Sequence, residues 1–422
     1  MQSFLPTWAV STKEHSVVDL LVLNGKIVAP DGQLAALDLA VDNGRIVAMG
    51  CGLKRDAHRT VDAHGHLVLP GVIDLHTHLR SPLGEADLFT GETSSAVAGG
   101  ITTVCDFAYP AGTRFELDFA AKRARLQSEA LCDFCLHTVV RAPDHLENIQ
   151  THTVKVFFSA SGLGTQASGA LGLLQGAVAD GHTVLAHVED IEDYLAILRE
   201  GISPNSHGRL HIAHVPHQRF VNLVRTLGNE RVTMETCPHY LLWEWVQVQA
   251  GCDVNPPVEP SDLWPEVRAG HISTIGTDHC SYTMQEKREM HLPGFPGLET
   301  LLRTVYTFGV KAGRISWADL CRALSAGPAR MLGLYPRKGV LQPGADADFV
   351  IFDTDHEDIM KAPTYGRGDF SPYAGLRLGG KVLSTFVRGR EVYSDGTADR
   401  NAAGWGKWQD GRAFAGGQNH GV

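Results

Sequence analysis

The sequence lacks several features that would place the protein in a specialised class. It contains no apolar run near the roughly 18 to 20 residues that span a bilayer, and residues 1–16 have no basic start followed by an apolar stretch. No lysine and arginine run is long enough to bind a polyanion, and the formal net charge is -10 over 422 residues. We therefore expect a cytoplasmic protein that binds neither membranes nor nucleic acids.

Cysteine is present without a disulfide pattern. The eight cysteines do not form a spaced framework and lie mostly in apolar runs, so we expect reduced thiols. Cys132 and Cys135 form one CxxC pair, but no second pair follows at the spacing of a zinc ribbon. Apolar residues make up 43% of the chain, which is ordinary for a globular protein and sufficient for a large buried core.

Both ends of the chain have a β-rich pattern. Short alternating runs separated by turns such as Asn24-Gly25 occupy residues 17–68, which predicts an antiparallel meander. The same pattern returns in residues 348–352 and 381–393. We expect the two ends to pair into one small β-sandwich domain.

The middle of the chain alternates strand-like and helix-like segments. Parallel strands need crossover helices, so this alternation predicts an α/β fold, a (β/α)8 TIM barrel. The eight strand-like runs are Gly71 to His78, Thr102 to Phe107, Phe134 to Val140, Val154 to Phe158, Thr183 to His187, Leu210 to His214, Arg231 to Cys237 and Ile272 to Asp278. We expect residues 70–336 to form the barrel, and residues 1–69 and 337–422 to form the β-sandwich domain with a tail.

Metal-type side chains follow several of these predicted strands. His76 and His78 are two residues apart, so their imidazoles point to the same side at the carboxyl end of the first strand, where barrel enzymes keep their sites. His187, His214 and Asp278 end three later strands. Each residue alone is more often structural than a ligand, but together they predict a metal site.

Lys155 lies within a strand-like run, Thr153 to Phe158, where an unpaired charge would be costly to bury. One interpretation is a lysine whose amine reaches the surface. The other is a lysine carbamylated by CO2, which becomes a carboxylate-like bridge between two cations. The residues alone leave both open, and without the surrounding pattern the first is favoured.

These motifs resemble the amidohydrolase superfamily, in the branch of hydantoinases (dihydropyrimidinases), allantoinases and dihydroorotases. The resemblance covers nearly everything from Leu20 to about Tyr393. The matching stretches are Pro70 to His78, Phe89 to Gly91, Ala98 to Thr103, Lys155, His187 to Asp190, His211 to His214, Glu235 to Leu241, Gly276 to His279 and Gly294 to Thr300.

The resemblance implies two divalent metal ions held by six residues. They divide into His76, His78 and Asp278 on one ion, His187 and His214 on the other, and Lys155 as N6-carboxylysine bridging both. Zinc is expected, and manganese or cobalt could substitute. A bridging hydroxide would then attack a ring amide, while Asp278 takes the proton and returns it to the leaving nitrogen.

The substrate is less sharply indicated. Arg80 stands where dihydroorotases place an arginine that pairs the substrate carboxylate, and Asn255 matches their version of its loop. This chain lacks the Pro-Asn-Thr segment that supplies another substrate contact in dihydroorotases, which argues against a true dihydroorotase. Against a standard hydantoinase, Ala160 replaces the oxyanion tyrosine, and the interval from His187 to His214 is short. We expect hydrolysis of a cyclic amide or ureide that carries a carboxylate or strongly polar group, with dihydroorotase or allantoinase activity as alternatives.

Two interpretations come from outside this branch of enzymes. A non-catalytic hydantoinase-like scaffold would lack metal ligands, whereas all six are present here. A single-metal deaminase would not need Lys155. We also expect His211, His239 and His279 to support the structure rather than bind metal, and the resemblance implies a homodimer or homotetramer.

Overall fold

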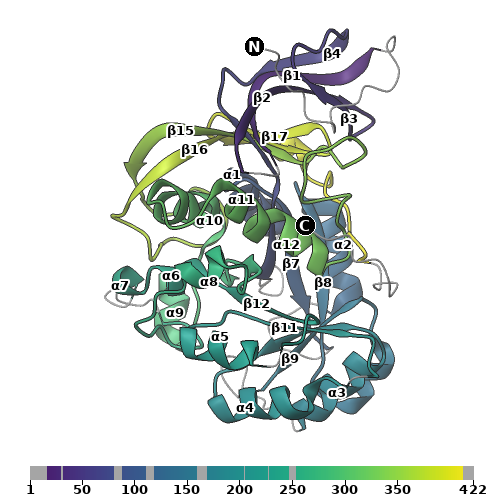
Figure 1. Cartoon of the computed structure of the whole chain (residues 1–422), viewed down its shortest axis with the longest axis vertical. Coiled ribbons are helices and arrows are strands. Elements are labelled where there is room, and N and C mark those ends of the chain that lie inside the picture. Colours follow the sequence, from purple (N-terminus) through teal and green to yellow (C-terminus); the bar gives the residue numbers. More distant parts are fainter. Residues whose placement is uncertain are drawn as a thin grey trace.

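The computed structural model describes residues 17–29, 32–79, 88–110, 118–158, 169–203, 205–226, 228–246 and 253–411. Two nine-stranded sheets organise this part of the chain (Figure 1). One sheet is built from the middle of the sequence and the other from its two ends. This arrangement confirms the predicted TIM barrel with an additional β domain.

The barrel sheet consists of strands that pair in parallel throughout. They are β6 (Val72–His78), β7 (Ile101–Ala108), β8 (Asp133–Val139), β9 (Thr153–Phe157), β10 (Thr183–His187), β11 (Arg209–Ile212), β12 (Val232–Thr236), β13 (Thr274–Ile275) and β14 (His279–Cys280). The last two are pieces of one stretch, because β13 pairs with β12 and β14 pairs with β6. Residues 274–280 therefore close the ring.

Helices connect the strands and cover the barrel. They are α1 (Leu88–Ala98), α2 (Phe119–Glu129), α3 (Ala170–Ala179), α4 (Ile191–Ala196), α5 (Gln218–Arg225), α6 (Pro238–Leu241), α7 (Trp243–Val246), α8 (Trp264–Arg268), α9 (Met284–Met290), α10 (Leu301–Val305), α11 (Trp317–Cys321) and α12 (Gly327–Met331). Asp118 caps α2, since its side chain accepts a hydrogen bond from Ala121 N at 2.8 Å. Within the described ranges, no helix has both the length and the apolar character to span a bilayer.

The second sheet joins the two ends of the chain. Its strands are β1 (Val18–Val28), β2 (Leu34–Asp42), β3 (Arg45–Gly50), β4 (Ala57–Asp62), β5 (Leu67–Pro70), β15 (Phe349–Ile359), β16 (Arg377–Val387), β17 (Arg390–Ser394) and β18 (Thr397–Ala398). The junction is β5, which pairs with β1 and with β15. The expected meander holds for β1 to β3, but β4 and β5 run parallel to β1. Turn signals alone do not show that residues 51–56 cross to the other edge of β1.

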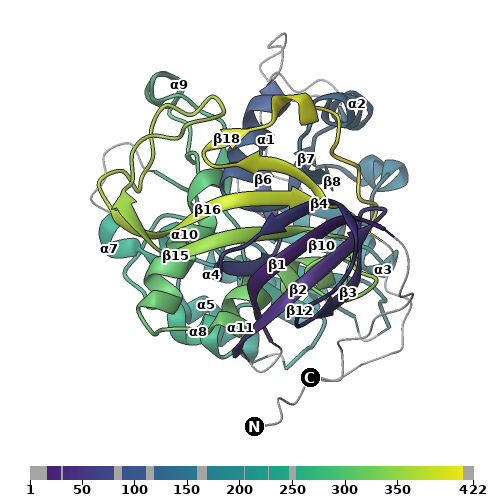
Figure 2. The same cartoon turned by 90° about the horizontal axis from the view of Figure 1, so that it is seen from above.

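Aromatic packing fixes the β domain internally and against the barrel. Phe349 and Phe386 are fully buried and stack with ring centroids 4.3 Å apart. Burying one such side chain contributes roughly 1.5 to 3 kcal/mol. Tyr306, which follows α10, packs edge-on against Phe352 of β15 with centroids 5.2 Å apart. Figure 2 shows strands of this sheet, among them β1, β2, β15 and β16, lying over helices of the barrel; within the sheet, β5 lies between β15 and β1.

Candidate metal centre

The carboxyl ends of the barrel strands bring all six predicted ligand residues into one cluster. His76 and His78 end β6, Lys155 lies on β9 and His187 ends β10. His214 follows β11, and Asp278 lies between β13 and β14. Carboxyl ends of parallel strands meet at the same rim, which is where barrel enzymes carry their chemistry.

Three of these residues form a compact group of donors. Asp278 Oδ1 lies 3.4 Å from His76 Nε2 and 3.2 Å from His78 Nε2. One donor atom from each residue lies within 4.8 Å of the others, so the group could hold a metal ion. Two imidazole nitrogens and a carboxylate oxygen are ligands that zinc commonly takes.

The other three residues adjoin this group. Lys155 Nζ lies 3.3 Å from His76 Nε2, and the His214 ring lies 5.1 Å from the His76 ring and 4.5 Å from the His187 ring. His214 Nδ1 is buried without a hydrogen-bond partner among the described residues. His187 Nε2 lies 2.7 Å from Glu189 Oε1. Among Lys155, His187 and His214, it is therefore His214 whose Nδ1 lacks a hydrogen-bond partner in the described chain.

Burial sets the protonation of the cluster. Lys155 is fully buried, and this burial lowers the pKa of its amine to about 8, partly offset by the charges of Asp278 and Glu235. Burial also lowers the pKa of His76 and His214 well below the usual value and raises the pKa of Asp278 to about 6. Neutral imidazoles and a readily deprotonated amine are the forms that metal binding and carbamylation require.

Two members of the cluster have strained backbones. His214 has a φ of 38° and Asp278 a φ of 53°, in the left-handed region that side chains other than glycine rarely adopt. Such conformations cost on the order of 1 to 2 kcal/mol each and persist where the surroundings fix them. Next to Asp278, Thr277 donates to Asp74 from its backbone N at 3.0 Å and from Oγ1 at 2.5 Å.

Glu235 supports the cluster, although sequence reasoning identified it only as part of a motif. His76 Nδ1 lies 2.9 Å from Glu235 Oε1, and both side chains are buried. Because a carboxylate only accepts, this contact places the proton on Nδ1 and leaves the Nε2 lone pair facing Asp278 and Lys155. The sequence signal that could have identified Glu235 is its place inside the predicted strand Arg231 to Cys237, where an unpaired charge would be costly to bury.

The remaining histidines of the matching motifs differ from one another in their partners. His211 lies 2.8 Å from Thr233 Oγ1 through Nδ1 and 3.3 Å from Thr274 Oγ1 through Nε2. His279 is bonded on both ring nitrogens. In contrast, both ring nitrogens of His239 are buried without a hydrogen-bond partner in the described chain. Burial lowers the pKa of His239 to about 4.

Of the two predicted substrate contacts, Asn255 lies among the described residues and Arg80 does not. Asn255 is half-buried, and its loop is tied to the barrel because Tyr240 Oη donates to Pro256 O at 2.7 Å. Arg80 and Ala160 lie outside the described residues.

Known proteins match this chain over most of its length. D-phenylhydantoinase of Escherichia coli (strain SE11) is 28% identical over 90% of this chain and 95% of its own. The structure of D-hydantoinase from Bacillus sp. AR9 has a TM-score of 0.80 at 26% identity and covers 94% of this chain and 99% of that one. L-hydantoinase (dihydropyrimidinase) from Arthrobacter aurescens gives 0.79 at 25% identity, covering 93% and 99%. The model of the amidohydrolase family matches residues 67–392, and this chain therefore belongs to that family, as its motifs predict.

Proposed function

We propose that this protein hydrolyses a cyclic amide with a pair of divalent metal ions at the barrel mouth. The observation that supports this proposal is the convergence of six ligand-type side chains from five strand ends in a barrel related to hydantoinases. The proposed ligands are His76, His78 and Asp278 for one ion, His187 and His214 for the other, and Lys155 for both.

The donor set fits such ions. Lys155 is fully buried, and no carboxylate lies within 4.0 Å of its Nζ in the described part of the chain. An ammonium group in that position would be costly, whereas a neutral amine can add to CO2. In that step the Nζ–C bond forms, Nζ loses a proton, and the product is a carboxylate at the end of the side chain. Zinc suits imidazole and carboxylate donors, and manganese or cobalt is a possible substitute.

The protein's own groups account for proton movement and orientation. When bound, paired divalent ions lower the pKa of a shared water and polarise a carbonyl. Asp278 accepts the proton of the attacking water and delivers it to the ring nitrogen as the C–N bond breaks. Glu235 holds the tautomer of His76. Phe107, which packs against His78 at 4.7 Å between centroids, covers one side of the cluster and limits the access of bulk water.

The substrate class is a five- or six-membered cyclic amide such as a hydantoin or a dihydropyrimidine. Dihydroorotate and allantoin are the alternatives. Arg80 and Asn255 are proposed to contact a carboxylate or another polar substituent, because a guanidinium pairs such groups well. We include in the proposal a cytoplasmic location, which the sequence composition leads us to expect, and a homodimer or homotetramer, which the resemblance to the family implies.

A small substrate panel tests the proposal. The zinc-loaded native protein and Arg80→Ala would be assayed with hydantoin, dihydrouracil, dihydroorotate and allantoin. We expect the native protein to open at least one of the four rings. A selective loss of dihydroorotate turnover in Arg80→Ala would favour the dihydroorotase alternative. Failure to open any of the four rings with both ions bound would contradict the proposed function and favour a scaffold.

A further inference from the structure

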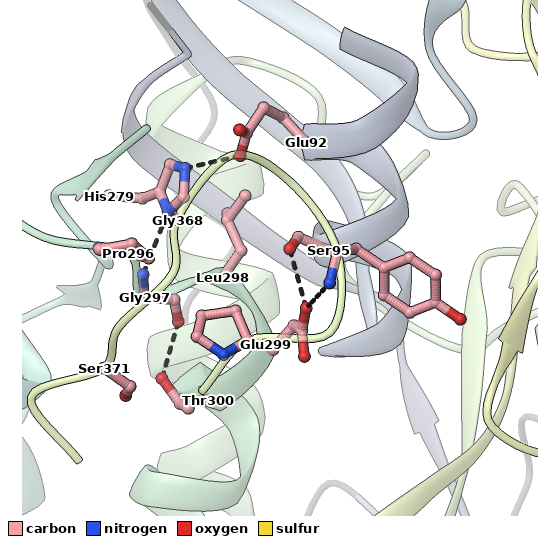
Figure 3. A pocket seen from close by; sticks show the side chains of 12 residues that line it. Glu92, Ser95, His279, Pro296, Gly297, Leu298, Glu299, Thr300, Gly368 and Ser371 are labelled. Carbon is pink, nitrogen blue, oxygen red and sulfur yellow. Dashed lines mark hydrogen bonds and ion pairs between the residues drawn. The ribbon is translucent and has the colours of Figure 1, made fainter. Parts of the chain in front are cut away.

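His279, the residue directly after Asp278, forms a buried hydrogen bond with Glu92 of α1 (Figure 3). His279 Nε2 lies 3.0 Å from Glu92 Oε2, and Gly297 N donates to His279 Nδ1 at 3.1 Å. The side chains of His279 and Glu92 are 2% and 1% exposed. Because the Gly297 amide is a donor, Nδ1 must accept, so Nε2 carries the proton and donates it to Glu92. The imidazole is therefore fixed in both tautomer and orientation.

The second oxygen of Glu92 is occupied by the connection between β15 and β16. Arg367 N donates to Glu92 Oε1 at 2.8 Å, and the Arg367 guanidinium binds Glu286 through two nitrogens at 3.0 Å and 2.7 Å. Gly366 lies so close that a Cβ there would approach Glu92 Oε2 to 2.8 Å. The connection between β15 and β16 thus lies against both oxygens of this carboxylate.

These contacts fix the residues on both sides of Asp278. Thr277 is bonded to Asp74 on β6, and His279 N donates to Thr277 Oγ1 at 3.0 Å. Asp278 itself has the left-handed φ of 53° and lies 3.2 Å from His78 Nε2. A strained residue keeps its conformation only where its neighbours are held. Glu92 and His279 supply that restraint on the carboxyl side, and Asp74 supplies it on the amino side.

We propose that Glu92 and His279 are positioning residues, which aim the Asp278 carboxylate into the metal cluster and couple it to the β domain through Arg367. The inference rests on the proposed function in so far as Asp278 binds metal. It assigns a role to a pair 187 positions apart in sequence that contains none of the six proposed ligands.

The same wall of the barrel offers a matched control. Ser95 lies one helical turn after Glu92 on α1, and its Oγ donates to Glu299 Oε1 at 2.9 Å. Glu299 in turn accepts from the backbone nitrogens of Thr364 and Tyr365. This link also anchors the β15 to β16 connection to the barrel, but it does not reach Asp278. Ser95→Ala therefore removes an anchor of the same kind without touching the proposed positioning pair.

The experiment compares Glu92→Gln with Ser95→Ala in the full-length protein. An amide has one acceptor oxygen, so the side chain introduced by Glu92→Gln cannot accept from both His279 and Arg367 in the native arrangement. We expect Zn2+ affinity, measured by chelator competition, to fall by roughly 10- to 100-fold in Glu92→Gln, as for other groups that orient metal ligands. We expect kcat to fall by a similar factor with KM within about 3-fold, while Ser95→Ala retains native affinity and kcat. Equal values for the two variants would overturn the proposal.

A second variant changes a residue of the β15 to β16 connection that lies against Glu92. Gly366→Ala adds a methyl group against the Glu92 carboxylate at a backbone φ of 75°, so it should displace this segment while Glu92 keeps its charge. We expect a smaller loss of Zn2+ affinity, about 3- to 10-fold, in the same direction. If Glu92→Gln does not fold, native affinity in a folded Gly366→Ala would overturn the proposal. Chelator competition needs no substrate, so native protein that binds zinc but opens no ring would defeat the proposed function and still allow the positioning role to be decided.

Discussion

Each end of the barrel buries a lysine, but the two lysines differ in whether a carboxylate is paired with them. At the carboxyl end, Lys155 is fully buried and has no carboxylate within 4.0 Å among the described residues. At the amino end, Lys338 is equally buried, but its Nζ lies 2.6 Å from Asp133 and 2.5 Å from Asp348. A buried charge is stable only when it is paired. The lysine at the mouth therefore lacks the partner that the lysine at the base already has.

The base is closed by the remaining contacts of Asp133. Arg388 forms an ion pair with Asp133, Lys407 N donates to its Oδ1 at 2.9 Å, and Gln409 Nε2 donates to its Oδ2 at 2.9 Å. The mouth instead holds His214 and Asp278 in left-handed conformations. We conclude that the base stabilises the barrel, whereas the mouth retains strain and ligand-type side chains for a bound ion.

The largest effect should follow from changing Asp278. Asp278→Asn removes the charge of a proposed metal ligand that is also the proposed proton acceptor, so kcat/KM of the zinc-loaded protein should fall at least about 10,000-fold, equivalent to about 5 kcal/mol. The metal-free variant should unfold at the native temperature or above it, because active-site strain is rarely stabilising. Steady-state kinetics and thermal unfolding measure both, and activity within tenfold of native would remove Asp278 from the mechanism.

Lys338→Met should lower the stability of the protein and leave its zinc binding unchanged. It leaves Asp133 and Asp348 buried without their cation, which should lower the free energy of unfolding by about 3 to 5 kcal/mol. The folded variant should bind as much zinc as the native protein. Lys311→Met is the control, since Lys311 pairs with Glu357 at the surface and such pairs contribute at most about 1 kcal/mol. Similar losses in urea unfolding for both variants would contradict the contrast between the two ends.

Metal binding should stabilise the mouth. Zinc and bicarbonate should raise the free energy of unfolding by about 2.7 kcal/mol when free zinc exceeds its dissociation constant 100-fold. The gain should shrink in Lys155→Ala and persist in Ser95→Ala. Urea unfolding with and without zinc provides the measurement, and identical midpoints would show that the cluster binds no ion in the folded state.

The pH dependence of activation should follow the amine of Lys155. Because the pKa of this group is lowered to about 8, its neutral fraction rises with pH and levels off above that value. With the concentration of dissolved CO2 held the same at every pH, the rate at which zinc and CO2 activate metal-free protein should rise about tenfold per unit up to pH 8 and then flatten. A rate that keeps rising toward pH 10 would indicate an amine in an ordinary environment.

Much of this architecture was predictable because local signals mark it. Each predicted barrel strand is present, since apolar runs bounded by turn residues specify strands, and barrel topology brings their ends together. The supporting contacts were not predictable. Glu235 meets His76 across 159 positions, and Glu92 meets His279 across 187, so neither partner follows from local pattern. The path of residues 51–56, which makes β4 parallel to β1, also depends on tertiary packing and not on local sequence.

The central claim is that neutral imidazoles, a carboxylate and a modified lysine hold two ions in the barrel mouth. Its most direct test is the metal content of full-length protein loaded with zinc and bicarbonate, measured together with the mass of the peptide containing Lys155 under conditions that preserve carbamates. The account predicts about two ions per chain, a carboxylated Lys155, and loss of the paired ions in Lys155→Ala. One tightly held ion in both proteins, with Lys155 unmodified, would contradict it.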